Sequence, residues 1–288
     1  PPQVYRLIRG KGVTHLCCAP TVLTSLYTSP AAAGQDLSGV TITTAGAPPA
    51  PQVIRKIERM GARLHHAYGL TETHGPHTIC ADQPEWENLA AEDRARLKAR
   101  QGVPYINAGA GLRVVDRRMR DVPRDGKTIG EVVMRGNYVM TGYYNDPQAT
   151  KKAFRGGWFH SGDLAVWHPD GYIELQDRAK DIIISGGENI SSQEVEKVIM
   201  EHPAVCEVSV VAVPDEKWGE VPKAFVAVLP GGQVSAEEII RFTRDCLSHF
   251  KCPKHVEFGQ LPKTATGKIQ KFKLREKEWE GREKKIHG

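Results

Sequence analysis

Long apolar runs and dense aromatic clusters are both missing from this sequence of 288 residues. No stretch approaches the ~20 apolar residues that cross a bilayer, and no signal-peptide pattern opens the chain. Aromatic residues make up 7% of the chain and do not alternate with basic residues as in nucleic-acid-binding segments. We therefore expect no membrane span and no nucleic-acid partner. Because the last three residues are no peroxisomal signal, we assign the protein to the cytoplasm by default.

Cysteine is scarce too. The six cysteines match neither the spacing of a zinc site nor that of a redox pair, and several stand in apolar runs. This pattern favours buried free thiols in a reducing compartment. The residues concerned are Cys17, Cys18, Cys80, Cys206, Cys246 and Cys252.

No segment except the C-terminal end carries an excess of positive or negative charge. The formal net charge is +5, and the segment 263–288 alone holds nine Lys or Arg against four Glu. Such a tail is typical of a solvated helix end, although a polyphosphate ligand would also suit it. The remainder of the chain is balanced.

The length and composition indicate a globular chain of two domains. At ~150 residues per domain, 288 residues predict about two. Hydrophobic residues make up 40% and charged residues 25%, which is ordinary for a globular protein. The chain begins with Pro1 in a segment that is typical of a helix inside a domain, so we expect it to be part of a longer protein.

Residues 1–80 alternate between helical and strand patterns. Buried strands are predicted at 13–19, 40–44 and 63–68, with helices at 4–9, 20–26 and 51–60. Short connections between them imply right-handed parallel crossovers. The loops 45–49 and 69–72 then leave the carboxyl ends of two parallel strands, the edge where α/β sheets bind ligands.

Three further patterns complete the first two thirds of the chain. Residues 84–100 predict a polar surface helix, and Asp146 before Pro147 predicts a capped short helix. Short β segments follow from 112 to 135. Residues 164–166 and 172–175, joined by His-Pro-Asp-Gly, predict a β-hairpin.

The pattern in the last third of the chain predicts a βαββαβ domain that has its own hydrophobic core. Strands are expected at 182–184, 205–213, 223–229 and 255–258, and helices at 192–201 and 236–249. Ser191 with Glu194, and Ser235 with Glu238, are capping-box patterns. Residues 185–189 predict a flexible loop.

Five motifs occur in a fixed order along the chain: Tyr-Gly-Leu-Thr-Glu at 68–72, residues 130–136 with 141–144, Ser-Gly-Asp at 161–163, Asp-Arg at 177–178, and Pro-Lys-Thr-Ala-Thr-Gly-Lys at 262–268. Each is weak alone, but the ordered set is specific. It resembles the adenylate-forming (AMP-binding) superfamily, which includes acyl-CoA synthetases, peptide-synthetase adenylation domains and luciferases. The resemblance covers nearly all of the chain and corresponds to the C-terminal half of a full enzyme.

The resemblance implies an α/β fold in two domains. Residues 1–176 would be the C-terminal part of the large AMP-binding domain, with a partial parallel α/β subdomain at 1–110 and a distorted β-barrel portion at 111–176. A hinge at 177–181 would lead to a small α+β C-terminal domain at 182–288.

Adenylation drives a carboxylate onto the α-phosphate of ATP and expels pyrophosphate, so the site must neutralise charge and bind Mg²⁺. Thr71 suits a phosphate oxygen and Glu72 suits the metal. Outside the 68–72 motif both would be ordinary loop residues. The resemblance makes Lys268 the lysine that bridges the substrate carboxylate and the α-phosphate, a task that suits a flexible ammonium.

The nucleotide-binding roles also come from the resemblance. Asp163 matches the aspartate that accepts hydrogen bonds from both ribose hydroxyls, although an acid after glycine can also be a turn former. Arg178 matches an arginine that contacts the same ribose, and its alternative is a surface ion pair. Tyr68 would stack on the adenine. The other residues implied around the base and phosphates are Gly46, Ala47, Pro48, His66, Ala67, Gly69 and Leu70, of which His66 could equally be a satisfied core histidine.

Transfer to CoA is assigned to a second orientation of the small domain. Lys180 matches the pivot, and the loop containing Gly186, Gly187 and Glu188 would approach the pantetheine arm. Trp218 would line that arm together with Glu220, although a packed Trp and a surface Glu are equally consistent with the sequence.

The Ser/Thr/Gly-rich phosphate loop of the family is missing, and no Walker-type loop replaces it. Of the acyl pocket, only 43–45 and 74–76 are expected here. The leading hypothesis is an ATP-dependent acid–thiol ligase of the kind used in fatty acid metabolism, with ATP/AMP, Mg²⁺ and CoA and a short- or medium-chain or aromatic acid. Two alternatives stay open: loading of a carrier protein, and nucleotide binding without turnover. A homo-oligomer is a further open question.

Overall fold

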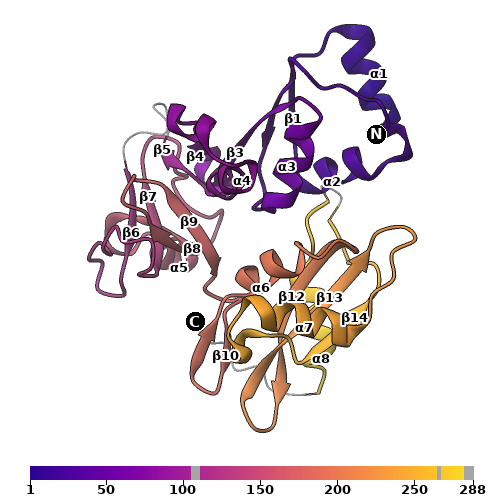
Figure 1. Cartoon of the computed structure of the whole chain (residues 1–288). Helices are drawn as coiled ribbons and strands as arrows, with labels where there is room; N and C mark the ends of the chain where they lie inside the picture. Colours follow the sequence, from indigo (N-terminus) through magenta and orange to yellow (C-terminus); the bar gives the residue numbers. More distant parts are fainter. Residues whose placement is uncertain (105–110, 265–266, 282–288) are drawn as a thin grey trace. The chain divides into compact units, whose positions relative to one another are not determined.

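The computed structural model describes residues 1–104, 111–264 and 267–281, and the chain divides into two compact units (Figure 1). Unit 1 is Pro1–Leu175 and unit 2 is Gln176–Gly288. Within the described residues, every helix is too short or too polar to traverse a bilayer.

The first sheet of unit 1 is the predicted α/β subdomain. Its strand order follows the chain, with parallel pairing from β1 to β3 and antiparallel pairing from β3 to β5. Three helices begin with a proline in the first turn, where the missing N–H costs nothing. The elements are α1 (Pro2–Lys11), β1 (His15–Cys18), α2 (Pro20–Thr28), β2 (Thr41–Thr44), α3 (Pro51–Arg59), β3 (Arg63–Leu70), β4 (Gly75–Cys80), α4 (Ala91–Lys98) and β5 (Val103–Pro104).

Two details of this subdomain differ from the prediction. The first strand is not buried, because β1 lies at the end of the sheet order and His15 and Cys17 are exposed. The single polar helix expected at 84–100 is instead a 3-10 turn, Pro84–Asn88, followed by α4. Its end is not polar surface either, since Lys98 and Arg100 are each only 4% exposed and form ion pairs.

The second sheet of unit 1 is a four-stranded meander. Its order is β6 (Gly111–Val115), β7 (Gly130–Arg135), β8 (Phe159–Trp167) and β9 (Ile173–Arg178). The predicted hairpin is present between β8 and β9. The barrel-like shape expected for 111–176 is wrong in one respect: the described strands form an open sheet and not a closed barrel. Residues at alternate positions of the strands form its core: Leu112, Val114, Val132, Met134, Phe159, Ala165, Trp167, Ile173 and Leu175.

Asp146 caps the short helix α5 (Pro147–Ala153), as its position before Pro147 predicted. Its carboxylate accepts a hydrogen bond from the Ala149 amide at 2.8 Å.

Unit 2 has the predicted βαββαβ order with one additional strand after the first and one additional helix at the end. Its sheet has the order β11-β10-β13-β12, and β14 pairs in parallel with β13. The Ser191 and Ser235 hydroxyls accept hydrogen bonds from the Glu194 and Glu238 amides, as the capping patterns predicted. The elements are β10 (Ile183–Ser185), β11 (Glu188–Ile190), α6 (Ser192–Ile199), β12 (Val205–Asp215), β13 (Gly219–Val228), α7 (Ala236–Cys246), β14 (His255–Phe258) and α8 (Lys271–Glu278).

The segment 185–189 is a tight hairpin and not the open loop expected from its glycines. Ser185 pairs with Glu188, and Gly186 and Gly187 occupy the turn with φ of 59° and 90°. Two adjacent left-handed residues are the geometry of a two-residue hairpin, which explains the Gly-Gly pair.

The basic C-terminal segment is only partly a solvated end in the part described, where Lys268, Lys273 and Lys277 are exposed. Four of its cations pair with carboxylates elsewhere in unit 2: Lys263 with Glu207, Lys271 with Glu196, Arg275 with Asp181, and Lys277 with Glu257. Local charge counting missed this because the partners lie far away in the sequence.

The expectation of buried thiols is only partly right. Cys80 and Cys252 are buried, but Cys17 and Cys246 are exposed. Burial raises the pKa of the Cys80 thiol to about 12, so this group is an inert thiol at neutral pH.

Candidate active site

The carboxyl edge of the parallel strands carries the first group of predicted site residues. Thr44 at the end of β2 pairs with His66 in β3, so the segments that follow both strands leave the same edge of the sheet. Gly46 is exposed with φ of 93°, and Ala47 and Pro48 are half-buried. A backbone that bends away from the strand end in this way can accept a flat ring against it.

The segment 69–72 is not a simple loop. Gly69 and Leu70 prolong β3 and pair with β4, and a 3-10 turn, Thr71–Thr73, follows. A side chain at Gly69 would collide with the Gly75 carbonyl, since a Cβ would lie 1.9 Å from that oxygen. Glycine is therefore required where the two backbones approach so closely.

The ring of His66 is buried and contacts backbone carbonyls. The side chain is 2% exposed, and its Nδ1 lies 3.0 Å from the Arg100 carbonyl oxygen and 3.2 Å from that of Ala99. Of the two interpretations left open by the sequence, these contacts favour the satisfied core histidine. Ala67 beside it is also buried.

Tyr68 and Asp163 come together although 95 residues separate them. The Tyr68 hydroxyl donates a 2.7 Å hydrogen bond to Oδ2 of Asp163, and both side chains are buried. The ring of Tyr68 packs against the core of the second sheet. Two of the sequence motifs thus meet at one hydrogen bond.

Glu72 is hydrogen-bonded to a residue of another motif, that of residues 141–144. The Tyr143 hydroxyl donates to Oε1 of Glu72 at 3.1 Å, and the Met140 amide donates to the Glu72 carbonyl at 2.7 Å. Burial, reinforced by the Glu72 carboxylate, raises the pKa of Tyr143, so this phenol remains a donor at neutral pH. No role was predicted for Tyr143 from the sequence, and its place in the 141–144 motif was the only signal. Thr71 is exposed beside Glu72.

The predicted hinge residues are tied to other parts of unit 2. Arg178 is half-buried and Lys180 is exposed. The Lys180 carbonyl accepts a 3.0 Å hydrogen bond from Arg275, whose guanidinium also pairs with Asp181 at 2.7 Å. Arg275 therefore fastens this segment to α8.

A charged cluster adjoins the same segment, in which Asp177 is buried and Lys271 and Glu196 are half-buried. Lys271 pairs with Glu196 at 2.7 Å and donates to the Ser192 hydroxyl at 2.6 Å. Asp177, 1% exposed, accepts from the Ser192 amide. Burial raises the pKa of both Asp177 and Glu196, and the Lys271 ammonium opposes that rise. For Lys271, burial alone would lower the pKa, but the two carboxylates outweigh burial and raise it.

Lys268 stands on a small closed turn. Its amide donates to the Thr264 hydroxyl at 3.1 Å, and its carbonyl accepts from the Thr264 amide at 2.8 Å. The side chain is exposed, and α8 begins three residues later. Thr266, which the sequence placed beside this lysine, lies outside the described residues.

The structure brings Trp218 onto the 185–189 hairpin. The Gly186 amide donates to the Trp218 carbonyl at 2.8 Å, and a Cβ on Gly186 would lie 2.7 Å from the indole ring. Gly187 and Glu188 are exposed beside it. Glu220 is different, because it is 8% exposed and accepts from the Ile184 amide at 3.0 Å. Its role is to hold β10.

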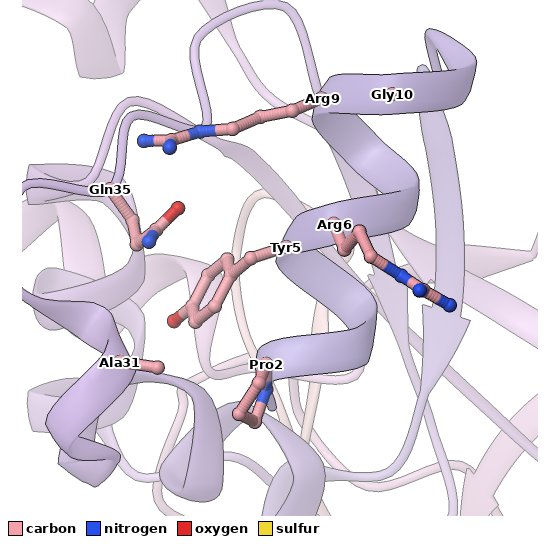
Figure 2. Close-up of a pocket in the computed structure, with 7 residues that line it drawn as sticks. All are labelled: Pro2, Tyr5, Arg6, Arg9, Gly10, Ala31 and Gln35. Carbon is pink, nitrogen blue, oxygen red and sulfur yellow. The ribbon is translucent and has the colours of Figure 1, made fainter.

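A pocket of about 470 Å³ lies elsewhere in unit 1 (Figure 2). Its lining comes from α1 and from the connection that enters the amino end of β2, so it lies away from the strand-end residues above. Tyr5 and Arg9 in its wall donate to backbone carbonyls, and we assign it no role. The lining residues are Pro2, Tyr5, Arg6, Arg9, Gly10, Ala31 and Gln35.

Comparison with known families agrees with the order of the motifs. The model described as AMP-binding enzyme matches residues 1–144, and the model described as AMP-binding enzyme C-terminal domain matches residues 194–268. The chain belongs to the AMP-binding enzyme family. The resemblance predicted from the motifs is thereby confirmed.

Relatives of this AMP-binding chain include named CoA ligases. Acetate–CoA ligase CCL3 of Humulus lupulus is 56% identical over 282 residues, covering 95% of this chain and 50% of the relative. Acetate/butyrate–CoA ligase AAE7, peroxisomal, of Arabidopsis thaliana is 51% identical over 286 residues, covering 96% and 50%. The chain thus spans about half the length of the curated relatives it matches. Since one of them is named as peroxisomal, the cytoplasmic assignment stays a prediction.

Solved structures share the fold. The anthranilate CoA ligase AuaEII, solved in complex with anthranoyl-AMP, superposes with a TM-score of 0.82 at 27% identity. The match covers 96% of this chain and 52% of that chain. The predicted α/β architecture with a small C-terminal α+β part is confirmed.

Proposed function

We propose that the protein carrying this chain is an ATP-dependent acid–thiol ligase, which adenylates a carboxylic acid and transfers the acyl group to CoA. The observation that supports it most directly is the 2.7 Å hydrogen bond between Tyr68 and Asp163, because it unites the proposed adenine and ribose residues. The names of the ligases at 51% and 56% identity support the same chemistry.

In this proposal, unit 1 holds the nucleotide. The backbone at Gly46, Ala47 and Pro48 and the ring of Tyr68 accommodate the adenine. Asp163 accepts hydrogen bonds from the two ribose hydroxyls, since a carboxylate has two oxygens in one plane. The exposed hydroxyl of Thr71 binds a phosphate oxygen.

Glu72 is the proposed contact to Mg²⁺. Among the described residues, no three His, Cys, Asp or Glu side chains gather in a way that suits a metal. One carboxylate is nevertheless compatible with Mg²⁺, which keeps several waters and is bound by one or two carboxylates together with substrate phosphates. The half-buried Glu72, steadied by Tyr143, fits that description. When bound, the ion neutralises phosphate charge.

Unit 2 contributes groups to both half-reactions in this proposal. Arg178 reaches the ribose, and the Lys268 ammonium neutralises charge between the substrate carboxylate and the α-phosphate. For the thioester step, the hairpin with Gly186, Gly187 and Glu188 contacts the pantetheine arm of CoA, and Trp218 packs against it.

The substrate that the relatives favour is a short-chain acid such as acetate or butyrate. The test measures pyrophosphate release and thioester formation with acetate, butyrate and an aromatic acid, using the protein at the full length of its relatives. Release of pyrophosphate with no thioester to CoA would favour loading of a carrier protein. Nucleotide binding without pyrophosphate release would overturn the ligase assignment.

Asp163→Ala is expected to weaken AMP binding by about 1.5–3 kcal/mol, because a charge-assisted contact is lost. Calorimetric titration with AMP measures the change, and circular dichroism verifies that the fold is retained. Asp121→Ala is the matched control, since Asp121 forms an exposed pair with Arg113. Equal dissociation constants for Asp163→Ala and the parent protein would reduce Asp163 to a turn residue.

Lys180→Pro is expected to spare one half-reaction and abolish the other. Proline fixes φ near −65°, so a backbone that must change φ at this position is held in one orientation. Adenylation and thioester formation are measured separately in the full-length protein. If both rates stayed within about twofold of the parent, a pivot at Lys180 would be wrong.

A further inference from the structure

We propose that Glu131 is a positioning residue, which holds the Ser161–Asp163 corner so that the Asp163 carboxylate faces the ribose. This inference depends on the proposed function of Asp163. Glu131 itself touches neither substrate nor cofactor in this proposal.

The corner interrupts the pairing of two strands. β7 and β8 pair at Glu131 with Leu164 and again at Val133 with His160, so the register shifts between these points. Two steps along β7 therefore face four steps along β8. Three residues of β8, Ser161, Gly162 and Asp163, therefore lie opposite a single residue of β7, Val132. Bulges of this kind re-aim side chains, but they also remove ladder hydrogen bonds from the backbone.

Glu131 supplies one of the missing acceptors. Its Oε1 accepts a 3.2 Å hydrogen bond from the Gly162 amide. Gly162 has a φ of 73°, a left-handed conformation in which its amide cannot follow the regular ladder. The side chain of one strand thus replaces the backbone partner that the bulge displaces.

The other oxygen of Glu131 is anchored by two further groups. Oε2 lies 2.7 Å from Nη2 of Arg155 and 2.8 Å from Nδ1 of His160. His160 is buried, and its Nε2 lies 3.1 Å from the Arg155 carbonyl. The carboxylate is therefore held in one orientation, which is what a positioning group needs.

Two more bonds complete the support of Asp163. Its amide donates to the Ser161 hydroxyl at 3.1 Å, and that hydroxyl donates to the Val132 carbonyl at 2.6 Å. At the far end of the side chain, Tyr68 donates to Oδ2. Of the three residues in the corner, Gly162 alone has no side chain to restrict its backbone, and Glu131 is the group that binds its amide.

The test compares AMP with 2′,3′-dideoxy-AMP, using the full-length protein. The dissociation constant of dideoxy-AMP divided by that of AMP isolates the contacts of the ribose hydroxyls. We expect Glu131→Ala to weaken AMP binding about tenfold, the value of roughly one hydrogen bond to a charged group, while binding of dideoxy-AMP is unchanged. The ratio should therefore fall by the same factor.

The matched control is Glu174→Ala. Glu174 in β9 also pairs with a histidine, His168, at 3.1 Å, next to the turn that joins β8 and β9. Its ratio should equal that of the parent protein. If the ratio of dissociation constants fell in both Glu131→Ala and Glu174→Ala, a general weakening of the sheet, and not positioning, would explain the result.

Glu131→Gln guards against a variant that fails to fold. An amide has one oxygen, so it cannot accept from Gly162 and from the Arg155–His160 pair together, and we expect the ratio to fall about threefold. An unchanged ratio in a folded Glu131 variant would overturn the positioning role. If Asp163→Ala itself left the ratio unchanged, the ribose assignment would fail instead, and the two failures are thus distinguishable.

Discussion

Lys268→Ala is expected to lower the rate of adenylation about 100-fold or more, equivalent to roughly 3 kcal/mol of transition-state stabilisation. The ammonium is proposed to neutralise charge that develops between carboxylate and α-phosphate, and alanine supplies none. Lys268 is exposed on the turn closed by Thr264, so the substitution changes no buried side chain. Acid-dependent pyrophosphate release by the full-length protein measures the effect.

Formation of thioester from supplied acyl-adenylate should be largely spared in the same variant, because the other orientation of the small domain serves that step. Lys273→Ala is the control, since Lys273 is exposed on α8 and has no proposed role. An equal loss in both half-reactions would show that Lys268 does not act in adenylation alone.

Lys271→Met is expected to lower the free energy of unfolding by about 3 kcal/mol. The substitution leaves the buried Asp177 carboxylate and the half-buried Glu196 carboxylate without their cation, and removing one partner of a largely buried pair is far costlier than losing a surface pair. Urea unfolding followed by circular dichroism measures the loss. Hydrogen exchange at the Ser192 and Val210 amides reports it locally, because these two amides donate to Asp177 and Glu196.

The loss in Lys271→Met should grow with pH. Burial raises the folded-state pKa of both carboxyl groups, and the variant lacks the ammonium that opposes this rise. A group with a raised folded-state pKa favours folding at pH below its unfolded pKa, and this contribution is lost as pH rises through the folded pKa. The variant should therefore lie closer to the parent protein near pH 4 than near pH 8.

Lys277→Met provides the comparison for this experiment, because its pair with Glu257 is exposed and such pairs contribute about 0–1 kcal/mol. If Lys271→Met were no less stable than Lys277→Met, the charged cluster would have no structural importance.

The order and type of the elements followed from local pattern. Proline at the first turn of α1, α2 and α3, and Ser191 and Ser235 before α6 and α7, are signals that act within one turn of a helix. The family motifs are equally local, since each occupies a few consecutive residues. Local patterns therefore predicted the alternating helices and strands of both parts, and the resemblance carried by the ordered motifs predicted the family.

Local pattern failed where the environment of a residue depends on distant segments. The sequence of 84–100 is polar, yet Arg100 is buried because Asp170 and the rings of Trp86 and Tyr172 surround it. Neighbours in the sequence do not predict this burial.

The candidate site divides in the same way. The sequence by itself determined which residue types stand at each motif: an acid at 163, a phenol at 68, an acid at 72 and a lysine at 268. Only the tertiary structure decided the partners, Tyr68 for Asp163 and Tyr143 for Glu72, and it alone showed the pair of Lys271 with Glu196. The physical reason is that each of these bonds joins residues at least 71 positions apart, so that it exists only after the sheets and helices have packed.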